Sequence, residues 1–106
     1  MLPQFPSEEV TVAVAAVFEG VTQEQYEESV RRLSGGKERM ESLSDWPVGG
    51  LLAHIAGQAQ NTFRVVDVWE SQEALEAFGA QLMPILRELG VEGEPEIYPV
   101  HTFVTA

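Results

Sequence analysis

The run from Val10 to Phe18 constrains the fold of this chain more than any other segment. β-branched residues recur at its alternate positions, which favours a β-strand, and both sets of alternating positions are apolar. A strand with no polar face is typical of the centre of a sheet that is covered on both sides. The run has nine residues, far fewer than the roughly 20 that cross a bilayer, so we expect no membrane insertion.

Two segments carry the start and stop signals of amphipathic helices. The first follows Thr22, which forms a capping box with Gln25, and it ends at a pair of glycines. The second follows Ser71 and ends at Gly90. Pro84 lies inside the second pattern, so we expect this helix to be kinked or divided in two.

Three further apolar runs predict the remaining strands. Residues 51–57 and 63–69 flank a short polar segment, which is typical of a β-hairpin. The last run, 97–105, contains Pro99 and is therefore predicted to lie at a sheet edge, where a missing amide costs no ladder bond.

Residues 34–50 form a connection longer than most in compact domains, and such connections are often lids or binding segments. We predict a short helical turn within Lys37–Leu43, with Met40 and Leu43 pointing inward.

The order strand, helix, strand, strand, helix, strand predicts one α+β domain over residues 10–106, after an extended lead-in at 1–9. Crossovers over the two helices predict that the first and third strands are parallel neighbours, flanked by the second and fourth. The predicted fold class is a ferredoxin-like βαββαβ sandwich, with a four-stranded antiparallel sheet and two helices on one face. Because the other face is also apolar, we expect two copies to stack as a homodimer, closing an α+β barrel.

The charge balance excludes several function classes. Six basic and 17 acidic residues give a net charge of -11, which argues against binding to nucleic acid. The chain has two histidines without matched carboxylates and no Gly-rich phosphate loop, so we expect neither a metal site nor a cofactor. The absence of cysteine fits a reducing compartment, and no basic residue precedes an apolar stretch at the amino terminus, so a cytoplasmic location is expected.

Asp67 is a carboxylate in the middle of an otherwise apolar predicted strand. It must be paired or protonated, and Arg64, His54 or Tyr98 could be its partner. The register of the hairpin decides which side chains share a face with Asp67, and the sequence leaves that register open.

If Asp67 and His54 meet in a pocket, they could form an acid/base dyad. The competing interpretation is a structural ion pair that holds the sheet or a dimer. Tyr26 could donate a hydrogen bond to a substrate oxygen, although its position also suits packing on Val21. For His101 a structural or interface role is favoured.

The segment Val65–Phe78, between a strand that bears His54 and one that bears His101, resembles the dimeric α+β barrel family. That family includes the antibiotic-biosynthesis monooxygenases, along with isomerases, polyketide cyclases and haem-degrading enzymes. The resemblance implies that Trp69 lines a pocket between sheet and helices, whereas a core position is the competing interpretation. Haem degradation is disfavoured, because Gly79 stands where that branch has a histidine.

The predicted function is therefore that of a small homodimer whose apolar pocket, gated by residues 34–50, holds a hydrophobic or aromatic small molecule. For an enzyme, the resemblance implies cofactor-independent oxygenation, isomerisation or cyclisation, in which His54 or Asp67 moves a proton. Tyr26, Trp69 and Phe78 are the candidate ligand contacts. The alternative is a non-catalytic ligand-binding or protein-interaction module.

Overall fold

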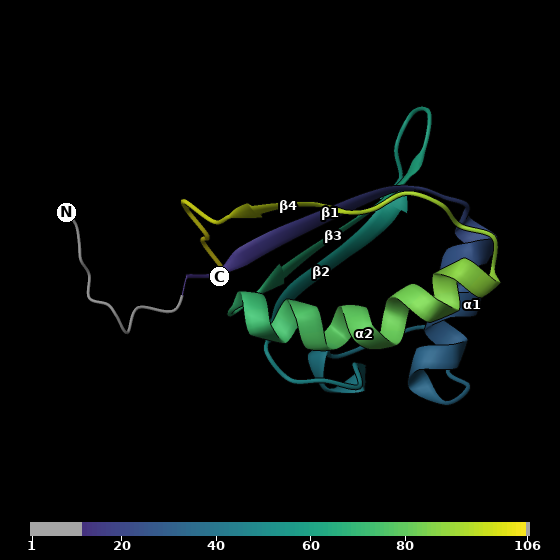
Figure 1. Ribbon diagram of the computed structural model, residues 1–106, viewed down its shortest axis with the longest axis horizontal. Coiled ribbons are helices and arrows are strands. Elements are labelled where there is room, and N and C mark those ends of the chain that lie inside the picture. Colours follow the sequence, from purple (N-terminus) through teal and green to yellow (C-terminus); the bar gives the residue numbers. More distant parts are fainter. Residues whose placement is uncertain (1–11, 106) are drawn as a thin grey trace.

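Four antiparallel strands form one sheet, and both helices lie on the same side of it (Figure 1). The computed structural model describes residues 12–105. Its elements in chain order are β1 (Val14–Val21), α1 (Gln23–Ser34), a 3₁₀ turn η1 (Leu43–Asp45), β2 (Leu51–Gln58), β3 (Phe63–Trp69), α2 (Gln72–Glu88) and β4 (Glu96–Pro99). The strand order is β2-β3-β1-β4, so the predicted α+β class, βαββαβ order and ferredoxin-like topology are confirmed.

The predicted direction of the two central strands was wrong. β1 and β3 are neighbours, but they pair in the antiparallel sense. The crossover through α1 makes β2 run parallel to β1, and the tight hairpin then reverses the chain. β3 must therefore run opposite to β1.

The first and last strands differ from their predicted bounds. Val10 lies outside the described residues, and β1 begins at Val14 and continues past Phe18 to Val21. Gly20, with φ of 100°, lies at an irregularity in the β1–β3 pairing near the end of β1. β4 ends at Pro99 and does not extend to residue 105, but it does lie at a sheet edge as predicted.

Both helices begin and end where the local signals predicted. The Gln25 amide donates to Thr22 Oγ1 at 3.0 Å, while Gln25 Oε1 accepts from the Thr22 amide at 2.9 Å. Ser71 Oγ accepts from the Ala74 amide at 3.1 Å at the start of α2. The predicted division of α2 does not occur, since the helix continues through Pro84 to Glu88. Proline removes one backbone bond, and the α2 side chains buried on both sides of it hold the helix together.

The turn predicted at Lys37–Leu43 lies further along the chain, as η1. The carboxylate of Asp45 accepts hydrogen bonds from the amides of Glu41 and Ser42 at 2.7 and 3.1 Å, and these bonds position the turn. Leu43 is 45% exposed and does not point inward, because it lies in the turn that these bonds hold at the surface. Met40 is half-buried and faces the sheet side, as predicted.

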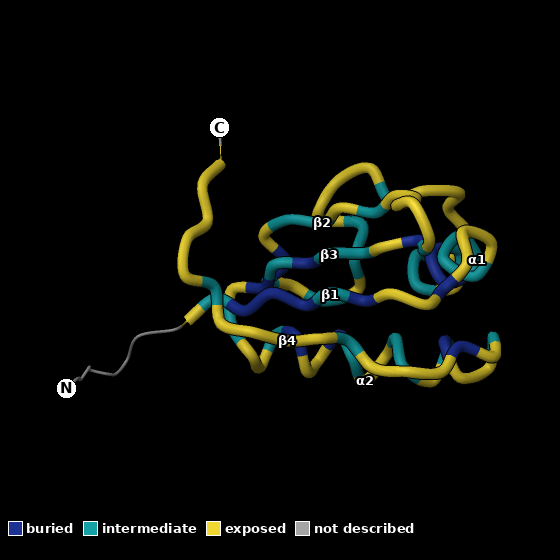
Figure 2. Tube along the Cα trace, turned by 90° about the horizontal axis from the view of Figure 1, so that it is seen from above, coloured by how far each residue is buried: buried dark blue, intermediate teal, exposed yellow. Residues whose placement is uncertain are grey.

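The core lies between the sheet and the helices. Along β1 and β3, alternate residues face the helices and are buried, among them Val14, Ala16, Phe18, Phe63 and Trp69. Figure 2 shows the two central strands as the most buried part of the sheet and β4 as exposed. Neither helix among residues 12–105 has the length and apolarity needed to cross a membrane.

The face of the sheet away from the helices is apolar over its centre. We call it the open face; register pairing brings together on it Ala15, Val17, Ile55, Val66, Val68 and Tyr98. Ile55, on the edge strand β2, is 66% exposed, whereas Ala15 on the central strand β1 is only 3% exposed. Charged side chains on the open face include Glu96, the cross-strand partner of Val17 on the edge strand β4. Towards one end, Arg64 Nε lies 2.7 Å from a Glu19 carboxylate oxygen.

Candidate functional site

A cavity of about 360 Å³ lies between the sheet and the helical layer. This size is in the range of small-molecule sites, and such sites combine an apolar wall with a few polar groups. The apolar wall comes from β1, α1, β3 and α2 and includes Phe18, Val30, Leu33, Val65, Leu75, Phe78, Leu82 and Met83. This cavity is called the pocket below.

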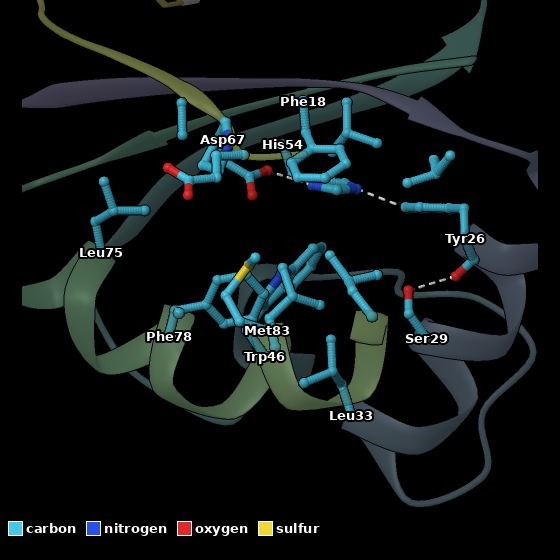
Figure 3. Close-up of a pocket in the computed structure, with 18 of the residues that line it drawn as sticks. Phe18, Tyr26, Ser29, Leu33, Trp46, His54, Asp67, Leu75, Phe78 and Met83 are labelled. Atoms are coloured by element: carbon cyan, nitrogen blue, oxygen red, sulfur yellow. Dashed lines mark hydrogen bonds and ion pairs between the residues drawn. The ribbon is translucent and has the colours of Figure 1, made fainter. Parts of the chain in front are cut away.

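Three polar side chains form a hydrogen-bonded chain along the pocket wall (Figure 3). His54 Nδ1 lies 2.5 Å from Asp67 Oδ1, and His54 Nε2 lies 2.7 Å from the hydroxyl of Tyr26. The side chains of His54 and Asp67 are only 14% and 11% exposed. We call Asp67, His54 and Tyr26 the relay, because a proton can pass along it by single hydrogen-bond steps.

The hairpin register brings His54 and Asp67 together. They are direct cross-strand partners in the β2–β3 ladder and point to the helix side of the sheet. The other two candidate partners of Asp67 lie elsewhere: Arg64 pairs with Glu19, and Tyr98 belongs to the open face. The question that the sequence left open is thereby answered in favour of His54.

Tyr26 reaches His54 from α1, one turn after the capping box that begins the helix. Its ring lies 5.9 Å from the His54 ring and nearly parallel to it, and 5.1 Å from the ring of Phe63. Tyr26 thus serves the core and the relay together. Packing on the sheet aims its hydroxyl at His54.

Burial and the nearby charge of Asp67 keep the Tyr26 hydroxyl protonated. Desolvation by burial is the main cause, and the Asp67 carboxylate adds to it, raising the pKa of Tyr26 to about 12. With Asp67 as a carboxylate, the His54 ring carries its proton on Nδ1 and donates it to Asp67. A neutral ring then accepts at Nε2, so Tyr26 donates its hydroxyl proton to His54.

Trp46 completes the aromatic frame around His54, and sequence reasoning did not single it out. Its ring lies 4.6 Å from the His54 ring, and it lines the pocket with Met40 from the same connection. A tryptophan in a mostly polar connection was a usable signal, because so large an apolar side chain needs a surface on which to bury.

The two remaining aromatic candidates lie in different places. Phe78 lines the pocket from α2. Trp69 is fully buried in the core, 5.0 Å ring to ring from Phe78, and is not among the residues that line the pocket. Its indole N–H has no hydrogen-bond partner within residues 12–105.

Gly79 and the charged residues mark the open side of the pocket. A Cβ placed on Gly79 would meet no heavy atom within 4 Å, so this glycine leaves space in the pocket wall and does not serve close packing. The exposed lining residues Glu76, Arg87 and Glu94 come from α2 and from the segment before β4. A ligand would therefore enter between α2 and β4.

His101 takes no part in this site. It follows β4, is exposed, and its Nδ1 lies 2.8 Å from Thr102 Oγ1. β2 and β4 are opposite edges of the sheet, so the two histidines lie far apart, as the sequence predicted. Among the described residues, no three histidine or carboxylate side chains cluster closely enough to hold a metal ion.

Comparison with protein-family models gives no match to this chain, and comparison with curated proteins gives no significant match either.

Proposed function

We propose that this protein binds a hydrophobic, ring-containing small molecule in the pocket and moves a proton to or from it through the relay. One observation carries the proposal: a buried carboxylate, imidazole and phenol, bonded in series, end at the wall of an otherwise apolar cavity. Such isolated polar groups are costly to bury unless they are fully bonded, and they are common at functional sites.

The proton transfer balances without a further reactant. A ligand X–H group gives its proton to Tyr26 Oη while the Tyr26 proton moves to Nε2 of His54, 2.7 Å away. The ligand becomes an anion, Tyr26 stays neutral and His54 becomes an imidazolium. The Asp67 carboxylate, 2.5 Å from Nδ1, stabilises that imidazolium and holds the ring in place. The reverse sequence returns the proton to another atom of the ligand.

This step is shared by the reactions that the dimeric α+β barrel resemblance implies. Cofactor-independent oxygenation, isomerisation and cyclisation of an aromatic or polyketide-like compound each begin with removal of a proton from an activated O–H or C–H group. The βαββαβ fold is common to many unrelated functions, so the site and not the fold supports the proposal.

Ligand binding without chemistry is a second candidate. The hydrogen bond between Tyr26 and His54 favours this candidate. Because the Tyr26 hydroxyl occupies Nε2 of His54, a ligand contacts the phenol before it contacts the imidazole. In that case ligands would stabilise the fold without being converted.

We also propose that the protein is a homodimer in which a second copy covers the open face. That face is apolar from Val66 and Val68 on β3 to the exposed Ile55 on the edge strand β2, and the apolar area continues onto β1. Two such faces stack at about 10 Å in sheet-on-sheet packing. Covering one with the other removes both from water and completes an α+β barrel.

A screen tests the proposed function. Aromatic and polyketide-like compounds are ranked by thermal stabilisation, and hits are followed by oxygen uptake and by product analysis. A ligand at 100 times its Kd adds about 2.7 kcal/mol to the unfolding free energy, which is several degrees in a domain of this size.

Two variants with matched controls assign the site. Gly79→Leu fills the pocket, and we expect it to abolish ligand binding while the fold stays intact. The control Gly57→Ala, on β2 and outside the pocket, should leave ligand binding unchanged. His54→Gln should lower turnover of a hit by about 10²- to 10⁴-fold, and His101→Gln should leave it unchanged. Wild-type turnover in His54→Gln would rule out the relay as the catalyst, and full binding by Gly79→Leu would rule out the pocket.

A further inference from the structure

Ser29 and the relay spend their side-chain hydrogen-bond donors within the protein. Ser29 Oγ donates to the Tyr26 carbonyl at 2.6 Å. With His54 as a neutral ring protonated on Nδ1, the Tyr26 hydroxyl donates to His54 Nε2 at 2.7 Å. His54 Nδ1 donates to Asp67 at 2.5 Å. Ser29, His54 and Asp67 are each largely buried, so these bonds do not exchange freely with water.

The valences that Ser29 and the relay leave unused are all acceptors. Tyr26 Oη and Ser29 Oγ each keep acceptor lone pairs, and the Asp67 carboxylate keeps more than the single bond to His54 uses. The wall also carries the negative charge of Asp67. Of the described residues that line the pocket, Arg87 alone is a cation, and it lies exposed at the open side in the last turn of α2.

From this polarity we infer that the ligand of the pocket presents an uncharged hydroxyl group, phenolic, enolic or alcoholic, that donates a hydrogen bond to Tyr26 Oη. A carboxylate has no donor to offer and is repelled by Asp67. A ketone or ether oxygen finds no donor on Tyr26, Ser29 or Asp67, so at this part of the wall it has no partner. The pocket-lining donors outside this group include the Trp46 indole N–H and the Arg87 guanidinium at the open side. The inference rests on the proposed function, because it assigns the chemical class of the ligand for the same site.

The state of Tyr26 supports this assignment. Its pKa of about 12 keeps the side chain a neutral phenol, whose oxygen accepts one bond while its proton remains with His54. The ligand hydroxyl then continues the chain of Asp67, His54 and Tyr26 by one further bond in the same direction. A group placed in this way is also the group whose proton the relay would remove.

Four probes that share one ring system test the inference on the unaltered protein: 1-naphthol, naphthalene, 1-methoxynaphthalene and 1-naphthoate. Kd is measured by calorimetry near pH 8, where imidazole side chains are ordinarily neutral. We expect 1-naphthol to bind about tenfold more tightly than naphthalene and 1-methoxynaphthalene, the gain from one net hydrogen bond. Because one of these donor-free probes is smaller than naphthol and the other larger, size alone does not explain such an order. The naphthoate should bind most weakly.

A matched pair of variants identifies the accepting atom. Tyr26→Phe keeps the ring that packs on Phe63 but removes the oxygen, so the preference for 1-naphthol should fall below about threefold. Tyr98→Phe makes the same chemical change on the open face and should keep the tenfold preference. Circular dichroism shows whether each variant is folded, and the comparison of probes on the wild type does not depend on either variant.

The outcomes separate this inference from the proposed function. Equal binding of 1-naphthol and its donor-free analogues, or tightest binding of 1-naphthoate, overturns the inference while the pocket remains a ligand site. A naphthol preference that survives Tyr26→Phe overturns Tyr26 Oη as the docking atom. Failure of all four probes to bind overturns the inference and the proposed pocket together.

Discussion

Tyr26 shows how one residue serves structure and site together. Its ring packs on Phe63, its carbonyl accepts from Ser29, and its hydroxyl bonds to His54. From the sequence, Tyr26 was a candidate for packing on Val21 and for a hydrogen bond to a substrate, with no sign of a bond to His54. The bond to His54 appears only when the helix is laid on the sheet.

We predict that Tyr26 titrates at an unusually high pH. Burial and Asp67 raise its pKa from 10.0 to about 12, so the folded state holds the phenolic proton more tightly than the unfolded chain does. The resulting stability is complete below about pH 10 and is lost as the pH rises through about 12. The difference in tyrosinate absorbance between wild type and Tyr26→Phe isolates this group. A midpoint near 10 would mean that Tyr26 is not buried against Asp67.

Gly50 is a second residue that the structure requires, because no side chain fits between it and α2. It has φ of 100°, and a Cβ there would lie 2.7 Å from Cβ of Ala74 on α2. We expect Gly50→Ala to lower the free energy of unfolding by about 2 kcal/mol or more, through backbone strain and overpacking. Gly49→Ala, with no atom within 4 Å of its Cβ, should change it by less than about 0.5 kcal/mol. Urea denaturation measures both, and equal effects would contradict the close approach of β2 and α2.

At the scale of elements, the connection between α1 and β2 builds one wall of the pocket. Met40 and Trp46 line the cavity, and Asp45 ties the segment between them together. Its carboxylate accepts two backbone amides and lies 3.2 Å from the ammonium of Lys37. This connection is thus organised around a single carboxylate.

We predict that this segment loosens in acid. The amides of Glu41 and Ser42, with Lys37, lower the pKa of Asp45 below its usual value. Its stabilising effect is therefore present above the unfolded pKa of about 3.9 and is lost as the pH falls through the lower folded value. Asp45→Asn should melt at a lower temperature than wild type at neutral pH, and the gap should close in strong acid. A pH-independent gap in calorimetry would contradict this account.

At the scale of the whole molecule, the helices cover only one side of an apolar sheet (Figure 1). The net charge of -11 keeps such a chain in solution, but it does not remove the cost of wetting the open face. In the proposed dimer a second copy would remove that cost. The pocket lies on the opposite side of the sheet, between the sheet and the helices.

We predict that Ile55→Asp produces a monomer. The side chain is 66% exposed on the open face, on the edge strand β2, so the change leaves the core untouched but places carboxylates in the proposed stack of sheets. Wild type and the control Leu43→Asp, altered at an exposed residue on the other side of the sheet, should sediment at twice the 11.7 kDa of the chain. A wild type that sediments as a single chain at micromolar concentration would overturn the dimer.

The features that the sequence predicted well are those that depend on near neighbours. Thr22 and Gln25 cap a helix within three residues, and the two apolar runs flanking a short polar turn form a hairpin whatever surrounds them. β1 is apolar at both sets of alternating positions, and this feature too is visible in the sequence alone.

Tertiary structure alone decided the composition of the site. His54 bonds to partners 13 and 28 positions away in sequence, and a one-residue slip of the hairpin would have turned it to the open face. The placement of Trp69 in the core and of Trp46 on His54 depends on how the helices and the long connection pack. Local sequence patterns determine the helices and strands because the caps and turns that define them join residues close in sequence. The relay, by contrast, exists only where α1, β2 and β3 meet.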